Sequence, residues 1–251
     1  MKFVGIIPAR YASSRFPGKP LVDIGGKTMI QRVYEQASAV LDSVYVATDD
    51  ERIFQAVQAF GGRVVMTSDQ HRSGTDRCAE AMGKLSGEAP DVVINIQGDE
   101  PFVDASQLQA LMACFDRPDT QIATLVKPFS EKDSYETLAN PNSPKVLLNK
   151  EGEAMYFSRS VVPYLRNVPQ EDYLQHHTFY KHIGIYAYRR DVLMQLAALA
   201  PTVLEKAESL EQLRWLENGY RIRTAITYVE NVAVDTPEDV ALCLTELARR
   251  K

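Results

Sequence analysis

Short apolar segments recur along the first half of the chain at intervals that leave room for a helix between them. They cover residues 3–7, 44–47, 64–66, 92–96 and 122–126. Two of the intervening segments, 29–41 and 53–60, carry apolar residues at helical spacing. Apolar strands that alternate with helices are typical of a parallel sheet covered on both faces. The sequence therefore predicts a doubly wound, mostly parallel α/β fold.

This rhythm changes after about residue 128. Residues 146–148 and 155–157 follow one another without a helix between them and predict a β-hairpin. Residues 179–188 predict a strand, and residues 193–199 and 210–216 predict helices. We interpret this part as a smaller mixed α+β insertion.

At the end of the chain, residues 222–229 return to a strand pattern. A helix follows, with Thr236 predicted as its N-cap and Pro237 as its first residue. We therefore expect a single domain over 1–251, with a nucleotide-binding half over about 1–128, an acceptor part over about 129–220 and a return to the core over 221–251.

Composition and charge exclude several classes of protein. The chain has 28 Lys and Arg against 33 Asp and Glu, a net charge of −5, so no overall positive field attracts it to nucleic acid or anionic lipid. No segment approaches the roughly 20 apolar residues of a membrane span. Three separated cysteines without a Cys-x-x-Cys pair indicate a reducing compartment. We expect a cytoplasmic protein that binds neither nucleic acid nor a membrane.

Three cations follow the first predicted strand. Arg10, Arg15 and Lys19 lie in the segment PARYASSRFPGKP. Ligands of open α/β sheets bind at the carboxyl ends of the strands, so these cations predict a polyphosphate site, with a solvated loop as the alternative. A P-loop requires Gly at the position of Leu21, so the P-loop motif is incomplete. No Gly-x-Gly-x-x-Gly follows the first strand, which argues against the dinucleotide-binding motif as well.

Two acids follow separate apolar segments. Asp99 comes after the strand 92–96, beside Gly98, which lets a ligand approach the backbone, and Asp235 comes after 232–234. If these two strand ends are neighbours, the carboxylates face each other and require a shared proton or a cation. Beside phosphates, Mg²⁺ fits this requirement. The alternatives are a simple turn at Asp99 and a helix-start acid at Asp235.

The segment HRSGTDR, residues 71–77, precedes a predicted helix. Its hydroxyls and backbone amides could read the edge of a base, and Gly74 allows close approach. The alternative is a helix start capped by Ser73 or Thr75. Both interpretations can hold together, because a cap uses one hydroxyl.

Polar candidates in the second half are Arg159, His182, Tyr186, Glu211 and Gln212. The spacing places His182 and Tyr186 on one face of a strand. That face could bind a polyhydroxylated acid, although each residue taken singly is also compatible with an ordinary structural role.

Together these motifs resemble the 3-deoxy-manno-octulosonate cytidylyltransferases, also called CMP-Kdo synthetases. The resemblance spans essentially the whole chain, and the matching segments occur in the family's order at residues 7–21, 71–77, 97–101, 156–159, 182–186, 210–214 and 234–239. One departure is Pro144, which stands before Lys145 where the family usually has an apolar residue. Because Pro removes a ladder donor, we expect an altered strand start and an intact site.

The resemblance implies transfer of CMP from CTP to the anomeric hydroxyl of the sugar acid Kdo, with release of pyrophosphate, for lipopolysaccharide biosynthesis. It implies a glycosyltransferase-A-like nucleotidyltransferase fold in a cytoplasmic, Mg²⁺-dependent homodimer, with the acceptor part also serving dimerisation. The alternatives are CMP transfer to a sialic acid or to amino-Kdo, and a non-catalytic CTP-binding regulator.

The resemblance also implies roles for individual residues. Catalysis falls to Arg10, Arg15, Lys19, Asp99 and Asp235, and the last two hold the metal. The nucleotide contacts Pro8, Ala9, Arg10, Arg15, Lys19, Ser73, Gly74, Arg77 and Gln97. The sugar acid contacts Arg159, His182, Tyr186, Glu211 and Gln212.

Overall fold

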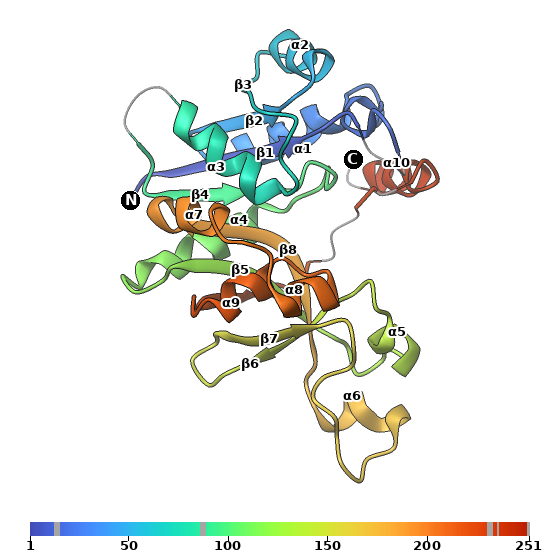
Figure 1. Ribbon diagram of the computed structural model, residues 1–251. Coiled ribbons are helices and arrows are strands. Elements are labelled where there is room, and N and C mark those ends of the chain that lie inside the picture. The colour runs from blue at the N-terminus through green and yellow to red at the C-terminus, as the bar shows by residue number, and fades with distance from the viewer. Residues whose placement is uncertain (13–15, 86–88, 230–232, 235, 250–251) are drawn as a thin grey trace. The chain divides into compact units, whose positions relative to one another are not determined.

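The computed structural model describes residues 1–12, 16–85, 89–229, 233–234 and 236–249 (Figure 1). Contacts divide the chain into two compact units. Unit 1 comprises Met1–Gln109, Tyr188–Ala197 and Glu230–Lys251, and unit 2 comprises Ala110–Ala187 and Ala198–Val229. Within the described ranges, no helix has the length and apolar character needed to cross a bilayer.

Unit 1 contains parallel strands in the order β3-β2-β1-β4. Their bounds, β1 Phe3–Ala9, β2 Val44–Thr48, β3 Val64–Met66 and β4 Val92–Asn95, confirm four of the predicted strands. All four residues of β4 are buried. Gly5 of β1 lies opposite both Val44 and Ile94, so β1 has a parallel neighbour on each side.

Capped helices connect these strands. Thr28, Asp50 and Ser73 each accept a hydrogen bond from a backbone N–H in the first turn of the helix that follows. These helices are α1 Met29–Ser38, α2 Glu51–Ala59 and α3 Gly74–Lys84. Both α1 and α3 contact β1 and β2 (Figure 1). The predicted α/β class is confirmed for this unit.

The remaining helical segments of unit 1 include α10, whose start differs from the sequence prediction. It covers Asp239–Arg249, so Thr236 is not its N-cap. The backbone N–H groups of residues 239–241 instead bond three residues back, and Thr236 donates to the Asp239 carboxylate. The other segments are η1 Lys19–Leu21, α7 Arg190–Ala197 and α4 Ala105–Ala113, which runs from unit 1 into unit 2.

A separate apolar cluster attaches α10 to the rest of unit 1. Cys243 of α10 is fully buried against Ile24, Met29 and Phe102, and Val234 belongs to the same cluster. Val240 and Leu247 pack against its edge. Val234 is therefore held by apolar packing in one cluster with Cys243 of α10 and with Ile24, Met29 and Phe102.

Unit 2 combines parallel and antiparallel strands. β5 Ile122–Pro128 pairs in parallel with β9 Ile222–Ile226, whereas β6 Lys145–Leu148 pairs antiparallel with both β7 Ala154–Ser158 and β8 Tyr180–Arg189, whose last two residues belong to unit 1. The predicted hairpin is confirmed. The other elements are η2 Cys114–Asp116, α5 Tyr135–Ala139, η3 Gln170–Asp172, α6 Tyr173–His176, α8 Val203–Glu208 and α9 Gln212–Glu217.

The unit boundaries differ from the expected halves. The second unit begins at Ala110 rather than near residue 129, and β9 belongs to it although residues from 221 onward were expected to return to the core. Parallel pairing explains the difference, since Ile122 of β5 lies opposite Ile222 of β9 and both strands stay together.

Pro144 lies directly before β6, where its missing N–H removes no bond from that strand. Its carbonyl accepts a 2.9 Å hydrogen bond from the His182 backbone N–H. The strand start is therefore compatible with Pro at this position.

Candidate functional site

Unit 1 has a cavity of about 260 Å³ where β1 and β4 end and α3 begins. The two strands end side by side because Ile6 pairs with Asn95. The cavity collects residues from four separate segments of the chain: Pro8, Ala9, Arg10, Lys19, Pro20, His71, Arg72, Ser73, Gly74, Arg77, Gln97, Gly98 and Asp99. Every described residue that was predicted to contact the nucleotide lies on this cavity.

Lys19 is a cation of the cavity that is held by two hydrogen bonds. Its Nζ donates to Asp99 Oδ2 at 2.8 Å and to the Val234 carbonyl at 2.8 Å. The side chain of Lys19 is 16% exposed and that of Asp99 is 31% exposed, so the ion pair is largely shielded from water. Lys19 and Asp99, which the sequence placed separately at strand ends, thus meet in the structure.

Val234 belongs to the C-terminal segment, and its backbone is bonded on both sides. Its N–H donates to the Asp99 carbonyl at 3.0 Å, while its own carbonyl accepts from Lys19. Sequence reasoning missed this contact, because a backbone carbonyl leaves no signal in residue identity.

Two of the predicted residues, Arg15 and Asp235, lie outside the described residues. Within the described ranges, no three His, Cys, Asp or Glu side chains gather closely enough to hold a metal ion. The oxygens of Asp99 and Val234 nevertheless converge on one ammonium group, and oxygen donors of this kind suit a hard cation.

The first turn of α3 forms one wall of the cavity. Ser73 Oγ accepts from the Asp76 N–H at 3.1 Å, so Ser73 is the helix cap, as predicted. A Cβ on Gly74 would lie 3.2 Å from Pro8 Cγ and 3.5 Å from Asn95 Nδ2. Glycine therefore lets α3 approach β1 and β4 at this point.

Arg77 is almost fully buried on the cavity wall. Its guanidinium donates to Asp49 Oδ2 at 2.7 Å and to Thr67 Oγ1 at 2.6 Å. These bonds connect α3 to residues that follow β2 and β3. Asp49 was not predicted from the sequence, although its position directly after a predicted strand was a usable signal.

His71 lines the cavity and pairs with Glu80 of α3. Glu80 was not predicted from the sequence. Glu80 additionally binds Lys84 and the Ser68 backbone N–H. These hydrogen bonds, that of Lys84 foremost, lower the pKa of Glu80 to about 2. The carboxylate therefore stays charged near neutral pH and orients the imidazole.

Gly98 follows β4, lines the cavity and lies against Pro8 of β1. A Cβ on Gly98 would lie 2.9 Å from the backbone oxygen of Pro8, a distance that real side chains essentially never show. The segment after β4 thus approaches the end of β1 closely at Gly98, and the approach of a ligand to this glycine stays a prediction.

In unit 2, His182 and Tyr186 share a face of β8, as predicted. Their ring centroids are 5.2 Å apart, and Tyr186 in turn lies 4.9 Å from Trp215. Burial lowers the pKa of His182 to about 3. Thr124 Oγ1 donates to the Ile185 carbonyl at 2.9 Å, so the hydroxyl oxygen is left to accept a hydrogen bond from His182 Nε2, also at 2.9 Å.

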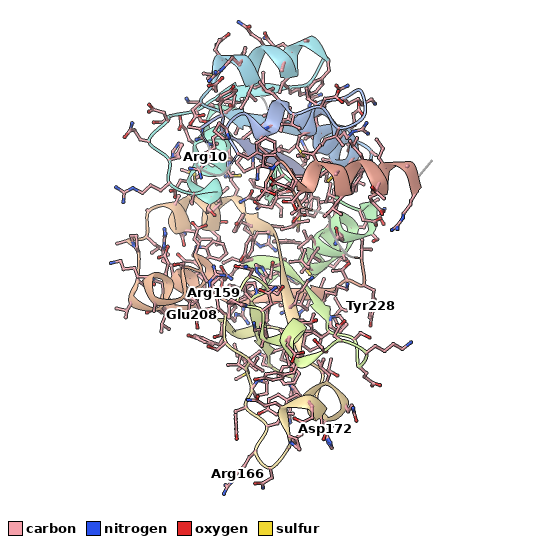
Figure 2. All side chains as sticks on the ribbon, turned by 90° about the vertical axis from the view of Figure 1, so that its right-hand side faces the viewer. Arg10, Arg159, Arg166, Asp172, Glu208 and Tyr228 are labelled. Carbon is pink, nitrogen blue, oxygen red and sulfur yellow. The ribbon has the colours of Figure 1, made fainter. Side chains whose placement is uncertain are left out.

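Arg159 lies beside Glu208 in unit 2 (Figure 2). Its guanidinium donates to three backbone carbonyls, those of Pro141, Glu208 and Ser209, at 2.8, 2.6 and 3.2 Å. The Glu208 carboxylate accepts from the Arg159 N–H and from Ser158 Oγ. Arg159 therefore fixes the turn that leads into α9.

That turn carries the other predicted acceptor residues. Glu211 precedes α9 and Gln212 begins it, and Gln212 is only 4% exposed. Its Nε2 is buried without a hydrogen-bond partner among the described residues. A buried donor of this kind is costly unless a ligand or water pairs with it.

Lys145 is a further buried cation near this turn. It is fully buried and its Nζ donates to the Asn140 carbonyl at 3.0 Å. Burial lowers the pKa of Lys145, and the neighbouring Glu208 carboxylate opposes that shift.

Residues 4–222 match the family described as Cytidylyltransferase. A 3-deoxy-manno-octulosonate cytidylyltransferase of Parabacteroides distasonis is 64% identical over 251 residues, which is 100% of both chains. One of Porphyromonas gingivalis is 55% identical over 244 residues, covering 97% of this chain and 96% of the relative.

Solved structures agree. CMP:2-keto-3-deoxy-manno-octonic acid synthetase complexed with CTP superimposes with a TM-score of 0.91 at 45% identity, covering 100% of both chains. A 4-diphosphocytidyl-2C-methyl-D-erythritol synthase from Anaerococcus prevotii has a TM-score of 0.62 at 14% identity over 99% of each chain, a likeness of fold alone.

Proposed function

This chain belongs to the cytidylyltransferase family, and we propose that it transfers CMP from CTP to the anomeric hydroxyl of Kdo and releases pyrophosphate. The proposed role of this reaction is in lipopolysaccharide biosynthesis. The observation that carries the proposal is the cavity of unit 1, which is lined by Arg10, Lys19, Arg77 and Asp99, with Lys19 paired to Asp99. This is the arrangement of charge that a nucleoside triphosphate requires, and relatives named for this reaction match the chain from end to end.

The reaction forms a bond from the sugar oxygen to the α-phosphorus and breaks the bond from that phosphorus to pyrophosphate. Negative charge grows on the leaving group, so most of the catalysis is alignment and charge stabilisation. Lys19 and Arg10 supply positive charge on the cavity wall. Arg15, from the same loop, is proposed to join them.

Mg²⁺ is the proposed cofactor, held by Asp99 and Asp235. The oxygens of Asp99 and Val234 that now surround an ammonium group are of the kind that suits this ion. When bound, Mg²⁺ would offset the charge of the triphosphate and of the departing pyrophosphate.

The proposed acceptor residues lie in unit 2. Neutral His182, Tyr186 and the unpaired Nε2 of Gln212 can hydrogen-bond hydroxyl groups, and Arg159 holds the turn that presents Gln212. Glu211, directly before Gln212, is proposed to accept hydrogen bonds from the sugar.

The proposed enzyme acts in the cytoplasm as a homodimer. Unit 2 exposes apolar and aromatic side chains that a partner subunit could cover, namely Met155, Tyr164 and Tyr228 at 62%, 77% and 78% exposure. Light scattering across a protein concentration series tests the dimer.

The test of the reaction is pyrophosphate release by the purified protein with CTP, Mg²⁺ and a panel of sugar acids. We expect release with Kdo, and at least about tenfold less with UTP, because a site that pairs with cytosine leaves polar groups unpaired against uracil. Release only with a sialic acid or with amino-Kdo would replace the acceptor. CTP binding by calorimetry without release from any acceptor would identify a regulator.

A further inference from the structure

Tyr11 occupies a position in the basic loop that none of the roles above explains. It follows Arg10 directly, and the guanidinium carbon of Arg52 lies 3.3 Å from the centroid of its ring. This is well inside the distance at which a cation over an aromatic face is attracted. Both residues belong to unit 1.

Arg52 is held in place by the helix that carries it. Its Nε and Nη2 donate to the two oxygens of Asp50 at 2.9 and 2.6 Å, and its backbone N–H donates to Asp50 Oδ1 at 2.9 Å. Asp50 is the N-cap of α2. The hydrogen bond from Arg52 lowers the pKa of Asp50, so the pair stays charged. The orientation of the guanidinium is thus set by the first turn of α2.

The Tyr11 ring also lies against Gly18. A Cβ on Gly18 would be 3.1 Å from both Cζ and Oη of Tyr11, and Gly18 has a φ of +73°. The Gly18 N–H donates to the Tyr11 carbonyl at 2.9 Å. Residues 11 and 18 are therefore joined through backbone and ring contact, directly before Lys19.

We propose that Tyr11 and Arg52 are positioning residues that hold the basic loop against α2 and thereby place Lys19 for the triphosphate. The proposal rests on the proposed function for its catalytic consequence. Its structural content is independent: the Arg52–Tyr11–Gly18 contact keeps the Lys19 ammonium between Asp99 and Val234.

A chemical test of this placement needs no turnover. An amine-reactive reagent labels shielded lysines slowly, and peptide mass spectrometry measures the rate at each lysine. In Arg52→Ala and Tyr11→Leu we expect Lys19 to be labelled about three to ten times faster than in the wild type, as loss of one cation–π contact allows. Lys27 and Lys84, which pair with Glu35 and Glu80, serve as internal controls whose rates stay constant.

Kinetics then test the consequence for the reaction. We expect kcat for pyrophosphate release to fall about three- to tenfold in the same variants, with little change in KM for Kdo. Tyr11→Phe keeps the ring and should recover most of the loss seen in Tyr11→Leu. Arg63→Ala is the matched control, since Arg63 stacks on Tyr45 at 5.7 Å, away from the loop.

The two variants should also depend on each other. Arg52→Ala made in the Tyr11→Leu background is expected to add little, because the contact is already lost. Unchanged Lys19 labelling in folded Arg52→Ala would overturn the proposal. Arg52 has a 60% exposed side chain, so this variant is expected to fold even if Tyr11→Leu does not. If Lys19 is labelled faster in the variants but the wild-type protein has no transferase activity, the proposed placement of Lys19 stands and the proposed function is rejected.

Discussion

The Lys19 ammonium lies 2.8 Å from the carboxylate oxygen of Asp99. The same carboxylate is the proposed metal ligand, so an ammonium group and a divalent cation would compete for one oxygen. The positive charge of Lys19 can instead be taken up by a triphosphate that arrives with the metal.

Lys19→Met is therefore expected to change metal affinity and activity in opposite directions. Without the ammonium, the protein alone should bind Mn²⁺ about ten times more tightly, as the loss of one repulsive charge near the surface predicts. Pyrophosphate release should fall about 100-fold, the usual effect of removing a charge-stabilising contact. Titration followed by electron paramagnetic resonance measures the affinity.

Arg10→Met is the matched control for this titration, because Arg10 lies on the same cavity but Lys19 is the cation bonded to Asp99. Equal Mn²⁺ affinity in the wild type and in Lys19→Met would show that the two cations do not share Asp99.

Asp99→Asn keeps the size of the side chain and removes its charge. We expect normal folding, because an amide oxygen remains within reach of Lys19, and a loss of activity of about 100-fold or more. Circular dichroism checks the fold, and release rates over a Mg²⁺ series check the activity. Wild-type metal dependence in this variant would remove Asp99 from the metal site.

Gly98→Ala tests the contact between the segment after β4 and the end of β1. The added Cβ would lie 2.9 Å from the Pro8 backbone oxygen, so that segment must move away from β1, at a cost of about 1–3 kcal/mol in the free energy of unfolding. KM for CTP should rise because Pro8 lines the cavity.

Gly83→Ala provides the control for that substitution. Gly83 lies within α3, and its Cβ would meet no atom within 4 Å of the described structure. Alanine is the better helix former, so the free energy of unfolding should rise by about 0.5–1 kcal/mol. Denaturant titrations of both variants, together with CTP kinetics, make the comparison; similar behaviour of the two would contradict the proposed crowding at Gly98.

Arg159→Ala removes the donor to three backbone carbonyls before α9. We expect the free energy of unfolding to fall by about 2 kcal/mol, and KM for Kdo to rise because Gln212 loses its support. Arg166→Ala, at an exposed position in the same unit, should change stability by less than about 0.5 kcal/mol. A raised KM with unchanged stability would assign Arg159 to the sugar itself.

His182 makes stability depend on pH. Its pKa is lowered from 6.5 to about 3, so between these values the unfolded chain binds a proton that the folded chain does not. The free energy of unfolding is expected to decrease as the pH falls through this window, by up to about 2 kcal/mol at pH 5. Denaturant titrations at pH 5 and 7.5 measure it, and His182→Gln should flatten the difference. An identical pH dependence in the variant would assign the effect to other groups.

Much of unit 1 could be predicted because its signals are local. Continuous apolar segments are strands buried on both faces, and Ser73 caps α3 through its own hydroxyl. The placement of the basic segment and Asp99 at one edge of the sheet also followed from the sequence, whereas the ion pair of Lys19 with Asp99 did not.

The remainder depends on contacts that residue identity does not encode. The sequence could not place β5 and β9 in one unit, because their pairing joins residues 100 positions apart, as Ile122 and Ile222 show. It could not show that Val234 contributes a carbonyl, or that Arg159 is occupied by three carbonyls. Backbone groups are identical at every residue, so only the folded chain selects among them.

The Val234 carbonyl also sets an order of assembly during protein synthesis. Lys19 leaves the ribosome well before one of its acceptors, which lies 215 residues later in the chain. A nascent chain can form β1 to β4 while this lysine still lacks that acceptor. The cavity of unit 1 is therefore completed only after Val234 has been synthesised and its backbone N–H has bonded to the Asp99 carbonyl.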